Sequence, residues 1–334
     1  MFFLDNGGSQ PPIIRIRDLS VSPPVALAPM VGLSHSALRS LVLEEGGVGL
    51  FFSEMLAIKR LPHDTPEQSP LLVRSSAEFP LFYQIVASGD EYIADAVHKL
   101  EALGAQGIDL NLGCPAPVLR KQGAGMFLLR NSSMLTTILT RLRNATRLPV
   151  SVKIRLGERG SAPELYAFCM YLIDLGVDLI TIHARLNGEK FCRRPRWGVI
   201  GEIKHRLTVP VLINGGIFSV DDARRCLEES GGDGLMIGRG AAGKPWLCRE
   251  IASALYGIPA HPRNRSFAEV FNRFIDLLEE RFAPERQLGR LKQFSAYFAL
   301  PLPFGHHFAT AMQTSRSIQE AKERAGRFFA REYH

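Results

Sequence analysis

One cysteine of this sequence stands where it could do chemistry. Cys114 lies between a glycine and a proline in DLNLGCPAP (Asp109–Pro117), just after a short apolar run that ends near Asn111. A thiol has a pKa near 8.5, so a protonated cysteine can act as a general acid and a partly ionised one as a nucleophile. The other cysteines fall in helical patterns or in a basic loop. We therefore take Cys114 as the candidate catalytic residue, in either role.

A second group of polar residues could hold a flavin. Lys153 and Arg155 alternate with apolar residues in SVKIRL, so both point to the same side of one strand. A buried lysine needs an anionic partner, and the N1–C2 edge of a reduced flavin is one. His183 in TIHAR and Gln84 in FYQIV offer a ring N–H and an amide to the same edge. Each could instead be a structural residue, or a strand-end group that reaches water.

Two glycine-rich stretches have the composition of a phosphate site. They are INGGI (Ile213–Ile217), which contains Asn214 and Gly215, and IGRGA (Ile237–Ala241), which contains Gly238 and Arg239. The second also begins a GxGxxG pattern, but a dinucleotide fold needs that pattern after its first strand. Glycines let backbone N–H groups approach a phosphate, and Arg239 adds positive charge. The alternative is that these glycines only make tight turns.

These residues need a scaffold that brings several strand ends together. Short apolar runs alternate with amphipathic helical segments, two of which begin at a serine that can cap a helix, Ser133 and Ser219. Eight such runs in about 240 residues favour a (β/α)8 TIM barrel, whose functional groups lie at the C-terminal ends of the strands. The predicted strands are Val25–Met30, Gly49–Met55, Leu81–Val86, Gly107–Leu112, Val150–Arg155, Asp178–Ala184, Pro210–Gly215 and Asp233–Gly238.

The C-terminal part of the chain has a different character. After a Pro- and Arg-containing linker (IPAHPRNRS), residues 263–334 show helical spacing and more Lys and Arg than Asp and Glu. We divide the chain into a barrel domain, residues 1–250, and a small basic helical domain, residues 251–334. One predicted helix carries Arg290, Lys292, Tyr297 and Phe298, which suits either RNA docking or packing on the barrel.

Composition limits the class of protein. The chain has 334 residues, 46% hydrophobic, and a formal net charge of +7, which weakly favours a polyanionic partner. No apolar run reaches the roughly 20 residues of a membrane span, and the start MFFLDNGGSQPP does not resemble an export signal. The five cysteines include no CxxC pair, so we expect reduced thiols, no metal site and a cytoplasmic protein.

Six separated motifs resemble, in order and spacing, the tRNA-dihydrouridine synthases. The resemblance covers residues 25 to about 250, and the helical tail is similar in kind more than in sequence. The motifs are LAPMVGLSHSALR, DLNLGCPAP with GAGMFLLR, SVKIRLG, TIHAR, PVLINGGI and MIGRGAAGKPWL. The resemblance implies an FMN enzyme that NADPH reduces. Flavin N5 would give hydride to C6 of a tRNA uridine, and Cys114 would give a proton to C5. We expect the enzyme to act as a monomer.

The resemblance also implies a role for each candidate residue. Pro29 and Met30 would lie against the isoalloxazine ring, and Gln84, Lys153 and His183 would hold its polar edge. Asn214, Gly215, Gly238 and Arg239 would take the phosphate end, while Asn111, Arg155 and Arg185 would bind the target uridine. Because uridine is stacked in folded tRNA, the base would have to be extruded into the pocket.

The sequence departs from the family pattern in two places. Val118 stands where many relatives carry a lysine, and LNGEKFCRRPRW (residues 186–197) replaces the common GRT-x-x-QGY. The second stretch is strongly basic through Lys190, Arg193, Arg194 and Arg196, so it either contacts phosphate or is a solvated loop. Both departures affect the expected substrate contacts more than the flavin site.

Two other functions fit part of the pattern. One is an FMN barrel that oxidises or reduces a free pyrimidine such as dihydroorotate, against which the basic tail argues. The other is an RNA-binding barrel that has lost catalysis, against which Cys114 and Lys153 argue.

Overall fold

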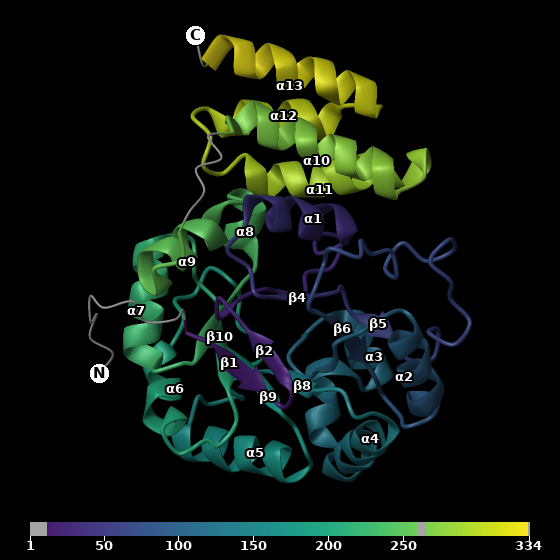
Figure 1. The fold of residues 1–334 in the computed structure, drawn as a ribbon, viewed down its shortest axis with the longest axis vertical. Coiled ribbons are helices and arrows are strands. Elements are labelled where there is room, and N and C mark those ends of the chain that lie inside the picture. Colours follow the sequence, from purple (N-terminus) through teal and green to yellow (C-terminus); the bar gives the residue numbers. More distant parts are fainter. Residues whose placement is uncertain (1–11, 260–264, 333–334) are drawn as a thin grey trace.

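The predicted barrel is present. A computed structural model describes residues 12–259 and 265–332, so the first 11 residues and the middle of the predicted linker lie outside it. Eight parallel strands close into a cylinder in which β4 pairs with both β3 and β6 (Figure 1). Its strands are β3 (Val25–Leu27), β4 (Leu50–Phe52), β6 (Leu81–Val86), β7 (Gly107–Asn111), β8 (Val150–Arg155), β9 (Leu179–His183), β10 (Val211–Asn214) and β11 (Gly234–Ile237).

Three short strands were not predicted. β1 (Ile14–Ile16) and β2 (Leu19–Val21) form an antiparallel hairpin, and β5 (Leu56–Ala57) adds to the edge of β6. Ile14, Ile16 and Val21 of the hairpin belong to one buried cluster with residues of the barrel strands such as Leu50 and Leu179. Burial of these apolar side chains ties the hairpin to the barrel.

Helices follow seven of the eight barrel strands as expected for βα units; the eighth unit was predicted wrongly, because residues 58–80, between β5 and β6, contain no helix. They are α1 (Ser36–Glu45), α2 (Ile93–Ala102), α3 (Pro117–Gln122), η1 (Gly125–Arg130), α4 (Ser132–Ala145), α5 (Ala162–Asp174), α6 (Trp197–Lys204), α7 (Val220–Ser230), α8 (Arg239–Gly243) and α9 (Leu247–Tyr256). Ser219 caps α7, as predicted, by accepting a hydrogen bond from Asp222 N. The Ser133 cap is wrong: Asn131 caps α4, because its side chain accepts from Met134 N at 3.1 Å.

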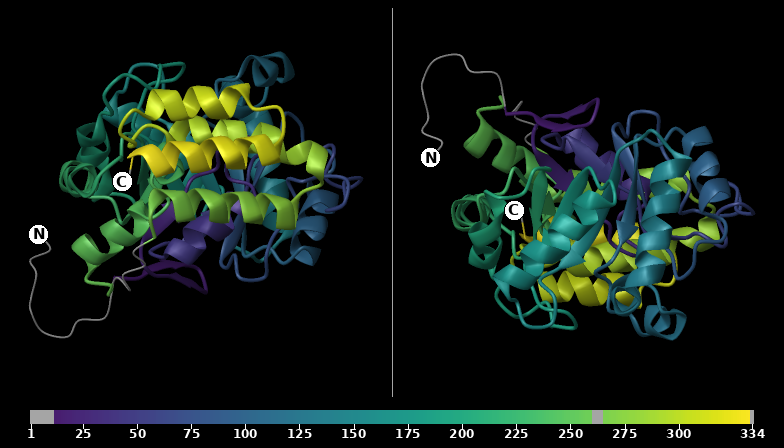
Figure 2. Two further views of the ribbon diagram at one scale, coloured as in Figure 1. Left: turned by 90° about the horizontal axis from the view of Figure 1, so that it is seen from above. Right: turned by 90° about the horizontal axis from the view of Figure 1, so that it is seen from below.

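Four helices of the C-terminal part form a bundle on one flank of the barrel, beside α1 and α8 (Figures 1 and 2). They are α10 (Phe267–Arg281), α11 (Gln287–Phe298), α12 (Gly305–Thr314) and α13 (Ile318–Glu332), with the short η2 (Pro284–Arg286) before α11. The rings of Phe271, Phe294, Phe298 and Phe308 pack in its core. Phe298 is fully buried, so of the two alternatives left open for this helix, packing rather than RNA docking holds for Phe298.

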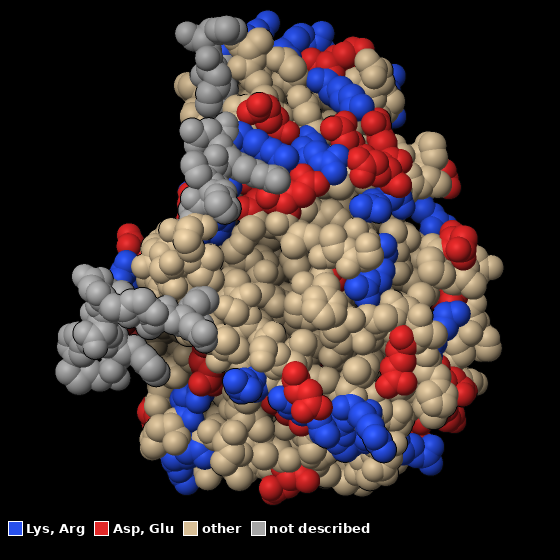
Figure 3. All heavy atoms as spheres, viewed as in Figure 1, with Lys and Arg blue, Asp and Glu red and all other residues tan. Residues whose placement is uncertain are grey.

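The bundle and the barrel are joined by ion pairs as well as by apolar packing. Arg273 and Arg265 both reach Glu44 of α1, at 2.7 and 3.2 Å, and Arg265 also reaches Glu45 at 3.4 Å. On the face seen in Figure 3, positive and negative side chains are therefore interspersed over the bundle. Part of the tail's basic character is neutralised at this junction.

The domain boundary predicted after residue 250 falls inside α9, which continues to Tyr256. We propose to place the division after that helix instead. Among residues 12–259 and 265–332, no helix combines the length and the apolar character that crossing a membrane requires.

Candidate active site

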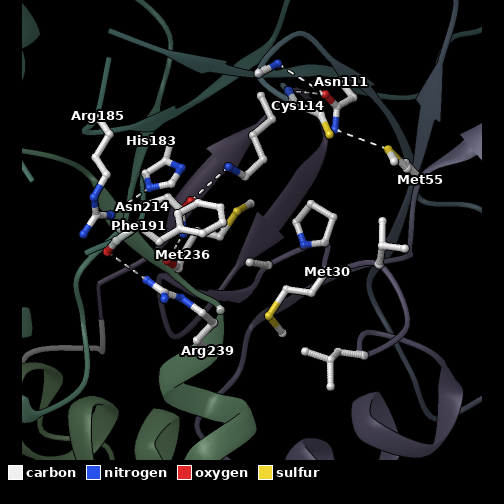
Figure 4. A pocket seen from close by; sticks show the side chains of 18 of the residues that line it. Met30, Met55, Asn111, Cys114, His183, Arg185, Phe191, Asn214, Met236 and Arg239 are labelled. Atoms are coloured by element: carbon white, nitrogen blue, oxygen red, sulfur yellow. Dashed lines mark hydrogen bonds between the residues drawn. The ribbon is translucent and has the colours of Figure 1, made fainter. Parts of the chain in front are cut away.

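Every residue predicted for the site lines one cavity of about 530 Å³ at the C-terminal ends of the barrel strands. Figure 4 shows Asn111, Cys114 and Met55 on one side of it and His183, Arg185, Phe191 and Arg239 on the other. The predicted residues in its lining are Pro29, Met30, Gln84, Asn111, Cys114, Lys153, Arg155, His183, Arg185, Asn214, Gly215, Gly238 and Arg239.

The loop that carries Cys114 is fixed by the residue at the end of β7. Asn111 Oδ1 accepts hydrogen bonds from the backbone N–H groups of Cys114 at 3.0 Å and Gly113 at 3.2 Å. Gly125 lies on the other side, where an added Cβ would stand 2.9 Å from the Cys114 carbonyl oxygen. The thiol is partly exposed, so the turn presents it to the cavity rather than burying it.

A buried polar layer lies beneath this loop, and sequence reasoning missed its centre. Asp109 is fully buried and accepts hydrogen bonds from Ser151 Oγ at 2.6 Å and Gln84 Nε2 at 2.7 Å. Burial raises the pKa of the Asp109 carboxyl to about 6. The strand period could have found it, because Asp109 and Asn111 share one face of β7.

Lys153 is half-buried in the same layer. Its Nζ donates to Asn214 Oδ1 at 2.9 Å, and Asn214 Nδ2 donates in turn to the Met236 carbonyl at 2.7 Å. Burial lowers the pKa of Lys153 to about 8, against the opposing effect of Asp109. The amide of Asn214 therefore holds Lys153 in place, and its contact with a phosphate stays a prediction.

His183 is held neutral on the opposite side. Burial, followed by the charges of Lys153 and three arginines, lowers its pKa far below the ordinary value. Arg185 Nη1 lies 3.0 Å from His183 Nε2. Because arginine has only donors, Nε2 must accept and Nδ1 carries the proton. His183 can thus offer one N–H to a ligand, as predicted.

On this side of the cavity, the Phe191 ring contacts a histidine and two arginines. The sequence analysis did not single it out. Its ring stacks on His183 with centroids 5.7 Å apart. The guanidinium carbons of Arg239 and Arg155 lie 4.8 and 5.5 Å from its centroid. Only the basic residues around Phe191 had drawn attention in the sequence.

The basic loop of residues 186–197 is largely folded onto the barrel. Arg155 donates to the carbonyls of Leu186 and Glu189 at 2.8 and 3.2 Å, and Arg185 Nε donates to the Arg193 carbonyl at 2.7 Å. Arg196 pairs with both carboxylate oxygens of Glu189. This pairing lowers the pKa of Glu189 to about 2. Arg155 and Arg185 therefore brace this loop while they line the cavity.

The two glycine-rich loops, after β10 and β11, lie closer to neighbouring atoms than tight turns alone would require. Gly215 has φ +108°, and an added Cβ there would meet the His183 ring at 2.5 Å. At Gly240 an added Cβ would meet the Ile217 carbonyl oxygen at 2.3 Å, so the loops after β10 and β11 touch. Only glycine permits this approach.

The helical bundle also contributes to the cavity. Gln293 and Tyr297 of α11 belong to its lining. Gln293 Nε2 donates to the Val31 carbonyl at 2.7 Å. We had considered Tyr297 for RNA docking or for packing on the barrel, not for the cavity. Gln293 was missed because periodicity does not reveal how a helix docks on a barrel. Within the part of the chain that the structure describes, no three His, Cys, Asp or Glu side chains gather as a metal site would require.

Comparison with known proteins identifies the family. The family model described as dihydrouridine synthase (Dus) matches residues 26–331. A probable tRNA-dihydrouridine synthase 1 of Synechocystis is 34% identical over 240 residues, 71% of this chain and 67% of that protein. A tRNA-dihydrouridine(16) synthase of Aquipseudomonas alcaligenes is 33% identical over 290 residues, 84% of this chain and 91% of that protein.

Solved structures give a likeness of fold. An old yellow enzyme homologue from Zymomonas mobilis superimposes with a TM-score of 0.54 at 13% identity, covering 74% of this chain and 92% of that one. The family model extends over both the barrel and the helical bundle, and the relatives align over most of their length. The chain therefore belongs to the dihydrouridine synthase family.

Proposed function

We propose that this protein reduces the C5–C6 double bond of a uridine in tRNA, with FMN as the bound flavin and NADPH as the reductant. The observation that carries the proposal is the single cavity lined by every residue that the family resemblance assigns to flavin, uracil and proton donor. The names of the relatives support tRNA as the substrate.

The donor set of the cavity fits a flavin. Lys153 is a half-buried cation whose lowered pKa indicates that a further anion nearby would stabilise its charged form. His183 Nδ1–H and the Arg239 guanidinium add donors, and Met30 and Met236 add apolar surface. A planar ring with one polar edge and a phosphate tail requires this combination of groups.

When bound and reduced, FMN supplies a hydride to C6 of the uracil. Cys114 holds the proton that C5 needs, and its loop presents the thiol to the cavity. Asn111 has both ends of its amide engaged within the chain, but one Nδ2–H faces only the thioether of Met55 at 4.0 Å. That weak contact leaves an N–H for the uracil.

Two features support a macromolecular substrate. Gln293 and Tyr297 bring the helical bundle to the cavity, so a nucleotide extruded from an RNA would meet barrel and bundle together. The net charge of +7 favours association with a polyanion. We also propose that the protein acts as a monomer in the cytoplasm.

The test uses purified protein and two substrates. We expect FMN to be released on denaturation, and NADPH-dependent formation of dihydrouridine in unmodified tRNA, measured by mass spectrometry of the nucleosides. Reduction of free uracil or orotate in place of tRNA would favour the pyrimidine alternative. A colourless protein that FMN cannot reconstitute would overturn the proposal.

A further inference from the structure

We propose that Asp109 is a positioning residue that sets the orientation of two successive amides and thereby fixes the loop of Cys114. This inference rests on the proposed function only in assigning a proton to Cys114. The geometry itself concerns Asp109, at the centre of the buried layer beneath the cavity, to which neither the family resemblance nor the site prediction assigns a role.

The residues form one continuous chain of hydrogen bonds across three strands. Gln84 of β6 donates from Nε2 to Asp109 Oδ2 at 2.7 Å. Asn111 Nδ2 then donates to Gln84 Oε1 at 2.8 Å, and Asn111 Oδ1 accepts from Cys114 N at 3.0 Å. The Ser151 hydroxyl of β8 holds the other carboxylate oxygen at 2.6 Å. The chain therefore begins at Asp109 and ends at the backbone of the catalytic loop.

The direction of this chain follows from Asp109. The amides of Gln84 and Asn111 can each be turned over, and only their partners decide which end is oxygen and which is nitrogen. An ionised carboxylate accepts and cannot donate, so Gln84 must present its NH₂ to Asp109 and its oxygen to Asn111. Asn111 must then present its NH₂ to Gln84 and its oxygen to the loop N–H groups. With both amides reversed, the Asn111 NH₂ would face the loop N–H groups, and two donors cannot form a hydrogen bond.

Burial makes it energetically costly to reverse either amide. Asp109 is fully buried and Gln84 is 1% exposed, so water is not available to satisfy a reversed amide. An apolar side chain at position 109 would avoid the cost of burying a carboxylate. We therefore infer that position 109 holds a carboxylate because it can only accept hydrogen bonds. The conformation of the Cys114 backbone depends on that acceptor.

The experiment compares Asp109→Leu with Asp109→Asn. Leu removes every acceptor, whereas Asn can keep its oxygen toward Gln84 and donate its NH₂ to Ser151 Oγ, which accepts as well as donates. Both variants carry Cys192→Ser, because Cys192 is exposed and would also react. The readout is the rate of Cys114 alkylation by iodoacetamide, followed by peptide mass spectrometry.

We expect the freed loop of Asp109→Leu to alkylate at least threefold faster, and Asp109→Asn to restore most of the difference. Dihydrouridine formation should fall at least tenfold in Asp109→Leu while flavin reduction by NADPH changes less than twofold. Ser151→Ala is the matched control, because it removes a hydrogen bond to Asp109 and leaves the link to Gln84 intact. Its alkylation rate should stay within twofold of the parent.

A folded Asp109→Leu protein with the parent's alkylation rate would overturn the inference. Equal acceleration in Asp109→Leu and Asp109→Asn would do the same, because amide polarity would then not matter. If Asp109→Leu does not fold, Gln84→Met breaks the next link and should accelerate alkylation to the same extent. Alkylation needs neither tRNA nor NADPH, so failure of the proposed function leaves this result readable.

Discussion

The two sides of the cavity are built in different ways. On the side formed by β6, β7 and β8, the polar side chains of Gln84, Asn111 and Asp109 hydrogen-bond to one another. The donor-to-acceptor direction of these hydrogen bonds is fixed. On the side formed by β9, β10 and β11, to which Arg155 at the end of β8 also points, cations surround a neutral histidine and an aromatic ring.

The difference indicates a division of work. On the first side, most hydrogen-bond donors and acceptors are paired within the chain, so few are available to a ligand. We infer that this side positions one reactive group, Cys114. The second side has more cations than anions, so we propose that it binds the anionic ligand. Lys153 lies between the two, close enough to Asp109 to feel its charge while it donates to Asn214.

The largest effect should come from removing the group that the first side positions. Cys114→Ala should slow dihydrouridine formation at least about 100-fold, the lower range for loss of a general acid. Flavin reduction by NADPH should change less than about twofold, because the second side stays intact. Stopped-flow absorbance measures the first half-reaction, and nucleoside mass spectrometry measures the product.

Cys192→Ala is the control, since Cys192 is the other exposed or partly exposed thiol among the described residues. It should leave both half-reactions near wild type. If Cys114→Ala slows both half-reactions equally, the acid role is wrong and the two sides do not work separately.

The next effect should appear at the lysine between the two sides. Lys153→Met should weaken FMN binding about 10- to 100-fold, because a charge-assisted hydrogen bond contributes about 1.5–3 kcal/mol. Fluorescence titration of the flavin-free protein measures this change. Lys190→Met makes the same substitution in the exposed loop and should leave the dissociation constant nearly unchanged. Equal affinities for the two variants would remove Lys153 from the flavin site.

The two sides should also respond to pH with opposite sign. His183 binds no proton in the folded protein, whereas the unfolded chain binds one below about pH 6.5. Its contribution to the free energy of unfolding therefore falls as pH drops below 6.5. Asp109 has a folded pKa of about 6, raised by burial from its ordinary value of 3.8. Between those values the folded protein binds the extra proton, so its contribution rises as pH falls.

Each group should change the free energy of unfolding by up to about 1.4 kcal/mol per pH unit within its window. Urea unfolding of flavin-free protein at pH 5 and pH 7 measures the slopes. Relative to wild type, His183→Gln should lose less stability on acidification, and Asp109→Asn should lose more. Shifts of the same sign in both variants would contradict the contrast between the sides.

The sequence predicted the barrel well because its strands are short apolar runs separated by turn residues and amphipathic helices, a local pattern. The same pattern located the strand ends, and so it located the residues that line the cavity, such as Lys153 and His183. The hydrogen-bond partners of these residues were harder to predict from the sequence. That Asn214 holds Lys153, or that Asp109 directs Gln84, depends on lateral strand register, which one sequence does not state.

Residues outside the strands were harder still to predict. Gln293 reaches the cavity because α11 docks against the barrel, and Phe191 does so because its loop folds back over Arg155 and Arg239. For Phe298 the sequence left packing and RNA docking both open, since helical spacing alone does not separate a core ring from a surface one. In each case the deciding contact joins distant parts of the chain.

The smallest effect should come from the aromatic ring of the second side. Phe191→Leu keeps an apolar side chain but removes the ring face that two guanidinium groups approach, each worth about 0.5–1 kcal/mol at an exposed site. The free energy of unfolding should therefore fall by about 1–2 kcal/mol, measured by urea titration. Phe218→Leu is the matched control, because Phe218 has a similar exposure but a single guanidinium contact, from Arg239 at 5.5 Å. It should cost less than about 1 kcal/mol. Equal losses for the two variants would mean that the cationic side is held by its hydrogen bonds to the loop carbonyls, and that Phe191 only covers them.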